Sequence, residues 1–136
     1  MLKYMTHAGL DVLDRTECYH LLRERRLGRV AVQLTDELLI LPVYYTLLDD
    51  DIVFRTSSGT KLNAALLRTQ VAFEVDHDDP GWSVLVTGHA QEVRGSAEQA
   101  AARTCLGNGW PAGQRECIVR IRAEKVTGRR LPINPA

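Results

Sequence analysis

The sequence has no surplus of either charge and no long apolar run. Its 136 residues include 17 Lys or Arg and 17 Asp or Glu, so the formal net charge is zero. A zero balance argues against general affinity for nucleic acid or anionic membrane, although it leaves room for a local basic site. No apolar run approaches the roughly 20 residues of a membrane-spanning helix. We therefore expect neither a nucleic-acid-binding nor a membrane protein.

Cysteine and histidine are few and scattered. Cys18, Cys105 and Cys117 form no CxxC pair, which excludes a sequence signature for a disulfide framework or a zinc knuckle. The four histidines are dispersed without an HExxH motif, so no metal site is predicted. Residues 1–14 show neither a long apolar core nor a small-residue cleavage pattern, and we expect no signal peptide. These features predict a protein of the reducing cytoplasm.

The residues that are present indicate one globular domain over residues 1–136. Hydrophobic residues make up 45% and charged residues 25%, an ordinary globular composition. Period-two alternation and β-forming residues predict six strands, mostly in antiparallel meander order, at 29–34, 38–48, 52–56, 70–76, 81–93 and 116–131. About three helices are expected, near 15–27, 60–69 and 96–106. The fold class predicted is therefore mainly β, with a few helices.

Several single residues mark where these elements begin, end or bend. Asp14, with a glutamate three residues later, has the spacing of a capping box, and Thr60 is placed to cap the second helix. Gly28 is expected to stop the first helix. Pro42 predicts a bulge or a locally unpaired position, and Gly88 predicts a bend.

The predicted strands carry more apolar surface than a single open sheet can bury. Several of them are apolar on both faces, whereas a sheet with one wet face alternates more strictly. Closing the sheet into a small barrel covers one face. Because a partner subunit covers the remainder most economically, we expect a homodimer.

Residues 54–68, FRTSSGTKLNAALLR, place cations and hydroxyls where a strand meets a helix. Arg55 and Lys61 stay charged near neutral pH, and Gly59 allows a tight turn. Four hydroxyl donors lie between the two cations, namely Thr56, Ser57, Ser58 and Thr60. With the free amides that open a helix, these groups describe an anion pocket, most simply for phosphate. A turn with solvated cations explains the same residues equally well.

Other charged groups are expected at the surface. The acidic clusters 49–51 and 77–79 follow strands and are interpreted as solvated hairpin tips. Arg120 and Arg122 share one strand face, for which a solvated face is the default expectation and a phosphate contact a weaker alternative.

Three segments in order resemble the flavin-binding split-barrel proteins of the pyridoxamine 5'-phosphate oxidase-like family. They are GRVAV with LLILPVYYTLLDDDIVFRTSSGTKLNAAL, then VAFEVDHDD, then GWSVLVTGHAQEV. The resemblance covers about residues 14–127 and is closest to short bacterial members described as flavin-nucleotide-binding proteins. It implies a six-stranded split β-barrel of the FMN-binding type, assembled as a homodimer with the cofactor at the interface.

The resemblance also implies positions for the cofactor. The phosphate of FMN would lie against Arg55, Thr56 and Lys61, with Ser57, Ser58 and Thr60 nearby. The isoalloxazine would lie beside Leu41, Pro42, Val43 and Tyr44. Trp82 and Ser83 would reach the same cofactor from the other subunit.

The activity implied is that of a flavin-dependent oxidoreductase acting on a small organic substrate. Two alternatives stay open: a deazaflavin-dependent reductase, for which Arg29 and Arg68 would supply extra charge, and a non-catalytic flavin carrier or sensor. The chain ends VTGRRLPINPA and lacks the Arg-rich, Trp-containing end of the namesake enzyme. Oxidation of vitamin B6 is therefore not expected.

Overall fold

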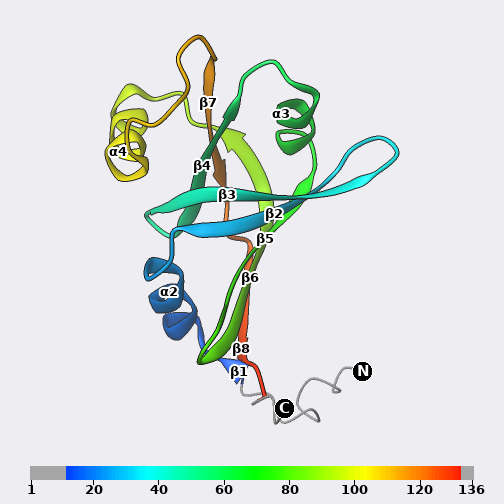
Figure 1. Cartoon of the computed structure of the whole chain (residues 1–136), viewed down its shortest axis with the longest axis vertical. Helices are drawn as coiled ribbons and strands as arrows, with labels where there is room; N and C mark the ends of the chain where they lie inside the picture. Colours follow the sequence, from blue (N-terminus) through cyan, green and yellow to red (C-terminus); the bar gives the residue numbers. More distant parts are fainter. Residues whose placement is uncertain (1–11, 133–136) are drawn as a thin grey trace.

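A computed structural model describes residues 12–132 of the chain (Figure 1). Its elements in chain order are β1 (Val12–Leu13), α2 (Arg15–Arg23), β2 (Leu27–Gln33), β3 (Leu38–Leu48), β4 (Asp51–Ser57), α3 (Lys61–Leu66), β5 (Gln70–Asp78), β6 (Gly81–Glu92), α4 (Ser96–Leu106), β7 (Glu116–Ile121) and β8 (Lys125–Arg130). Most of the segment predicted to lack a signal peptide lies outside these described residues. None of the described helices has the length and apolar character needed to cross a membrane.

Six antiparallel strands close into a barrel. Following the strand pairing around the sheet gives β2, β3, β4, β7, β6 and β5, and β5 pairs again with β2. β6 also pairs with β8, and β8 with the short β1, so these two strands extend the barrel on one side (Figure 1). The prediction of a mainly β, six-stranded barrel with a few helices is confirmed.

The predicted final strand is divided in two because β6 changes partner along its length. Residues 82–87 of β6 pair with β8, whereas residues 90–92 pair with β7. The change takes place at Gly88, where an added Cβ would lie 1.7 Å from the carbonyl oxygen of Arg122. A backbone atom cannot move aside as a side chain does, so this crossing requires glycine.

Local capping signals are confirmed, and the expected role of Gly28 is wrong. Asp14 Oδ1 accepts a hydrogen bond from the backbone amide of Glu17 (2.8 Å), and Thr60 Oγ1 accepts one from the amide of Asn63 (3.0 Å). Gly28 lies inside β2 rather than at a helix end. An added Cβ there would lie 2.3 Å from Cζ of Phe73, so the glycine allows a core ring to pack against the strand.

Arg120 is buried, which corrects the expectation of a solvated face. Its guanidinium binds the carboxylates of Asp51 (2.8 Å), Glu98 (2.6 Å) and Asp49 (3.4 Å). Burial of a guanidinium requires such partners, and the β3–β4 turn and α4 supply them. Arg120 of β7 therefore joins the acidic turn to α4, while Arg122 remains exposed.

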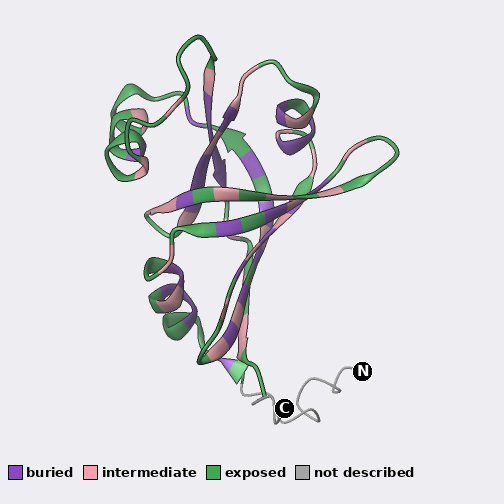
Figure 2. Ribbon diagram, in the orientation of Figure 1, coloured by how far each residue is buried: buried purple, intermediate pink, exposed green. Residues whose placement is uncertain are grey.

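One stretch of β3 leaves apolar side chains uncovered and an edge open (Figure 2). Within the described residues, 38–44 pair with β2 alone, and Leu38, Ile40 and Tyr44 are each more than two-thirds exposed. The amide of Tyr45 donates to Arg26 O on the β2 side. Because amide direction alternates along a strand, the nitrogen of Pro42 faces the open edge, where its missing hydrogen costs no sheet bond. A homodimer would cover this surface, and it stays a prediction.

Candidate functional site

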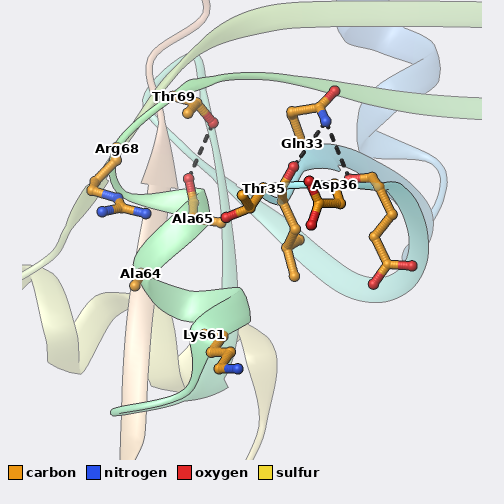
Figure 3. A pocket seen from close by; sticks show the side chains of 10 residues that line it. Gln33, Thr35, Asp36, Lys61, Ala64, Ala65, Arg68 and Thr69 are labelled. Atoms are coloured by element: carbon orange, nitrogen blue, oxygen red, sulfur yellow. Dashed lines mark hydrogen bonds between the residues drawn. The ribbon is translucent and has the colours of Figure 1, made fainter.

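A cavity of about 430 Å³ lies between α3 and the β2–β3 hairpin, and we call it the Lys61 cavity (Figure 3). Its lining residues are Gln33, Leu34, Thr35, Asp36 and Glu37 from the hairpin and Lys61, Ala64, Ala65, Arg68 and Thr69 from α3 and the residues after it. The hairpin is held in shape by Gln33 Nε2, which donates to Leu34 O (2.8 Å). A helix and a loop that are distant in the sequence therefore form its two walls.

Two cations and two carboxylates line this cavity, and none of the four is paired within the described residues. Within residues 12–132, the side chains of Lys61 and Arg68 make no hydrogen bond or ion pair with the protein. Asp36 and Glu37 lie on the hairpin wall and are exposed. Two cations without protein partners on the α3 wall favour binding of an anion there.

The hydroxyl groups of the strand–helix junction are mostly engaged inside the protein. Thr56 is buried and donates to Asn63 Oδ1 (2.6 Å), and Ser57 donates to Gln114 Oε1 (3.0 Å). Thr60 caps α3, as described above. These bonds fix the turn that precedes Lys61. None of the four hydroxyl residues of the junction lines the Lys61 cavity.

Arg55 lies apart from Lys61. Its guanidinium donates to the carbonyl oxygens of Gly107 (2.7 Å) and Leu106 (3.1 Å) at the end of α4, and it pairs with Glu116 (3.3 Å). The side chain is only 13% exposed. It lines a separate cavity of about 200 Å³ together with Arg103 and Trp110. The two cations thus line different cavities of one chain, and a cofactor role for Arg55 stays a prediction.

Strand alternation divides the four residues predicted to lie beside a flavin ring. Leu41 and Val43 are half-buried and pack against the barrel core, whereas Pro42 and Tyr44 are exposed on the opposite face of β3. A planar ligand on the outer face of β3 would therefore contact Pro42 and Tyr44, and the backbone of the open edge would be within its reach.

Trp82 and Ser83 lie at the far end of the barrel from α3. Trp82 is part of the core and 2% exposed. Its pairing partner on β8 is Arg130, and β8 pairs in turn with β1 (Figure 1). Ser83 donates to Glu74 Oε2 (3.1 Å). Burial raises the pKa of Glu74, and the Ser83 hydroxyl acts in the opposite direction. One chain does not bring this pair to the Lys61 cavity, so their role rests on the predicted second subunit.

The hairpin residues of the Lys61 cavity were not identified from the sequence. The sequence of the segment after β2 predicts only a turn, and it contains no motif that predicts packing beside α3. From the sequence, Arg68 was predicted only to supply extra charge for a deazaflavin, and its position beside Lys61 was not predicted. Within the described residues, no group of three or more His, Cys, Asp or Glu side chains is arranged to hold a metal ion.

Comparison with known proteins gives consistent matches over most of the chain. The uncharacterized protein Rv0080 of Mycobacterium tuberculosis is 35% identical over 128 residues, which cover 88% of this chain and 84% of that protein. The structure of an FAD-binding protein from Mycobacterium smegmatis shares 36% identity with a TM-score of 0.80, covering 90% of this chain and 99% of that one. A conserved protein of unknown function from Corynebacterium diphtheriae shares 32% identity, with a TM-score of 0.74 and coverage of 90% and 98%.

The family model described as pyridoxamine 5'-phosphate oxidase matches residues 14–130. This range includes all six strands of the barrel and both walls of the Lys61 cavity. The resemblance read from the sequence is thereby confirmed, and the chain belongs to the pyridoxamine 5'-phosphate oxidase family.

Proposed function

We propose that this protein binds a flavin nucleotide at the Lys61 cavity and acts as a flavin-dependent oxidoreductase on a small organic substrate. The observation that carries the proposal is the pair of cations, Lys61 and Arg68, that line a cavity of about 430 Å³ without protein partners. The Mycobacterium smegmatis relative, 36% identical over nearly its full length, is named an FAD-binding protein.

The residues present fit two parts of a flavin nucleotide, the phosphate and the ring. A phosphate needs cationic donors, which Lys61 and Arg68 supply. The ring needs a flat apolar surface and backbone hydrogen bonds at its polar edge. The outer face of β3 offers Ile40 and Tyr44 beside the open edge of residues 38–44. When bound, the flavin supplies hydride or electron transfer, while the protein's residues hold it and limit access to it.

The proposal includes a homodimer in the cytoplasm. The exposed apolar face of β3 would be covered by a second subunit, which would also bring Trp82 and Ser83 toward the cofactor. The three cysteines, all of which are free, support the proposed cytoplasmic location.

The chemical form of the cofactor divides the proposal into three candidates, which are FMN, FAD and a deazaflavin. FMN is the cofactor that the sequence resemblance implies. FAD is favoured by the name of the Mycobacterium smegmatis relative. Mass spectrometry of the ligand released on denaturation, followed by titration of the protein with FMN and FAD, would decide between them. Competition by a deazaflavin in the same titration tests the third form.

Flavin binding is tested with purified protein and charge variants at the cavity. Lys61→Ala and Arg68→Ala should each weaken flavin affinity by about tenfold to a hundredfold, because each removes a charge-assisted contact. Lys125→Ala is the matched control, since Lys125 is an exposed lysine in β8. Absence of flavin absorption after addition of excess FMN and FAD, or equal affinity in all variants, would contradict the proposal.

Catalysis is tested separately from binding. Stopped-flow reduction of the flavin-loaded protein by a nicotinamide nucleotide should show a saturable rate if the protein is an oxidoreductase. A carrier or sensor would bind flavin without saturable turnover, which would leave the binding proposal intact and refute the enzymatic one.

A further inference from the structure

A second group of cations surrounds a cavity of about 350 Å³ at the α2–β2 connection, which we call the arginine cavity. Its polar lining consists of Arg23, Arg25, Arg26, Tyr45, Thr46 and Cys105. The remaining lining residues are leucines, and no carboxylate is among them. α4 contributes Cys105, so the cavity forms only when the α2–β2 connection, β3 and α4 come together.

Two of the three guanidinium groups lack protein partners. Arg25 Nε is buried and is the single buried side-chain nitrogen or oxygen without a hydrogen bond among residues 12–132. The exposed side chain of Arg26 makes no hydrogen bond or ion pair within the same range. Arg23 is bound to Asp50 (3.3 Å). Because a half-buried guanidinium without a counter-charge is costly, an anionic ligand beside Arg25 would offset its charge.

The cavity on the other face of the Arg25–Arg26 segment differs from the arginine cavity because carboxylates line it. A neighbouring cavity of about 420 Å³ includes Glu24 and Asp76 in its lining. Glu24 pairs with His20 (3.2 Å), and Asp76 pairs with Arg29 (2.6 Å). Those two carboxylates offset most of the positive charge of Arg25, Arg26 and Arg29 on that face, whereas no carboxylate lines the arginine cavity, so an anion is expected at the arginine cavity.

The arginine cavity is separate from the Lys61 cavity within one chain. The two cavities lie at opposite ends of β2, whose seven residues span roughly 20 Å at about 3.3 Å each. The two phosphates of one dinucleotide are adjacent and would not reach both cavities. Ligand binding at the arginine cavity is therefore independent of the proposed flavin phosphate anchor.

We propose that the arginine cavity binds the phosphate group of a small molecule. The three guanidinium groups and the carboxylate of Asp50, which pairs with Arg23, have a net charge of +2. This charge matches a phosphate dianion. Tyr45 adds no competing charge, because burial raises the pKa of its hydroxyl, which donates to Leu22 O (2.6 Å). Thr46 supplies a neutral donor at the same wall, and the leucines offer apolar contact for the remainder of a phosphate ester.

Calorimetric titration of the full chain with inorganic phosphate, pyrophosphate and a simple phosphate monoester, at constant ionic strength, tests the site. Saturable binding is expected, and Arg25→Gln and Arg26→Gln should each weaken it by about tenfold or more. Arg94→Gln is the matched control, because Arg94 is exposed and lies in the β6–α4 connection, outside the arginine cavity. A monoester that binds more tightly than inorganic phosphate identifies an organic ligand, whereas the reverse order identifies free phosphate; both support the site.

Cys105 provides an independent readout, because Cys18 and Cys117 are buried and Cys105 is exposed. Phosphate should slow alkylation of Cys105 by neutral iodoacetamide in the wild-type protein but not in Arg26→Gln, whose substitution lies at an exposed position. Circular dichroism confirms that each variant is folded. The proposal is overturned if phosphate fails to saturate, if acetate protects Cys105 equally well, or if the arginine variants bind phosphate as the control does. An equal loss of FMN affinity in these variants would overturn its independence from the flavin site.

Discussion

Replacing Arg55 with alanine separates a structural role from a cofactor-binding role. The guanidinium donates to two carbonyl oxygens at the end of α4 and pairs with Glu116, and both side chains of that pair are 13% exposed. Its removal leaves those carbonyls without a donor. Glu116 retains Arg103 at 2.7 Å, which moderates the loss. We expect Arg55→Ala to be destabilising through the anchoring of α4 and the loop after it.

The expected loss is about 3 kcal/mol, the lower end for removing one partner of a buried ion pair. An unfolding entropy of about 2.1 cal/mol/K per residue gives roughly 0.3 kcal/mol/K for this chain, so Tm should fall by about 10 °C. Urea unfolding followed by circular dichroism measures the free energy change directly, provided that the slope of the transition is unchanged.

Arg103→Ala is the matched control, because Arg103 binds the same carboxylate but is 46% exposed. The loss of stability in Arg103→Ala should be smaller than in Arg55→Ala, below about 1 kcal/mol. If Arg55→Ala is no less stable than Arg103→Ala, the reasoning from the carbonyl contacts is refuted. The same variant tests the cofactor role predicted from the sequence: measured where the protein is fully folded, a large loss of flavin affinity would place Arg55 at the phosphate.

Three further perturbations address the cavity, the barrel crossing and acid stability. Lys61→Ala should lower flavin affinity as stated above while leaving the urea midpoint unchanged, and a shifted midpoint would show a structural role instead. Gly88→Ala should cost about 3 kcal/mol or more, because its Cβ meets a backbone oxygen, whereas Gly109→Ala meets no atom within 4 Å and serves as the control. The pKa of Asp76 is lowered by a hydrogen bond from Glu74 and by Arg29, so this stabilisation is complete above the ordinary value of 3.8 and is lost as pH falls below it. Arg29→Gln should reduce this stabilisation by Asp76. An unchanged acid-unfolding midpoint in the variant would argue against the assignment of the effect to the Arg29–Asp76 pair.

The sequence predicted the barrel because alternation is a local property. Val30 and Val32 in β2, and Val71, Phe73 and Val75 in β5, are buried as their period-two spacing indicates. The caps at the starts of α2 and α3 were predicted for the same reason, since a cap involves residues only three apart. The resemblance to the family depends on the same segments and was confirmed.

The composition of the candidate site was predicted only in part. Lys61 lines a cavity beside α3, but Arg55 extends to the end of α4, some 50 residues later in the chain. Alternation along β4 puts Arg55 and Thr56 on opposite faces, yet it does not say which element lies opposite each face. Two of the three acceptors that hold Arg55 are backbone carbonyls, which carry no residue-specific signal.

Local spacing in this sequence therefore predicted the alternating barrel strands, the starts of α2 and α3 and the family, but neither β1 nor the division of the final strand into β7 and β8. The tertiary structure alone decided which cations keep their charge available for a ligand. Arg120 and Arg55 are bound by groups brought from distant elements, whereas Lys61, Arg68 and Arg25 are left without partners within the described chain. The physical reason is that pairing of a charge depends on what packs across from it, and that is fixed only when the barrel closes and α3 and α4 pack against it.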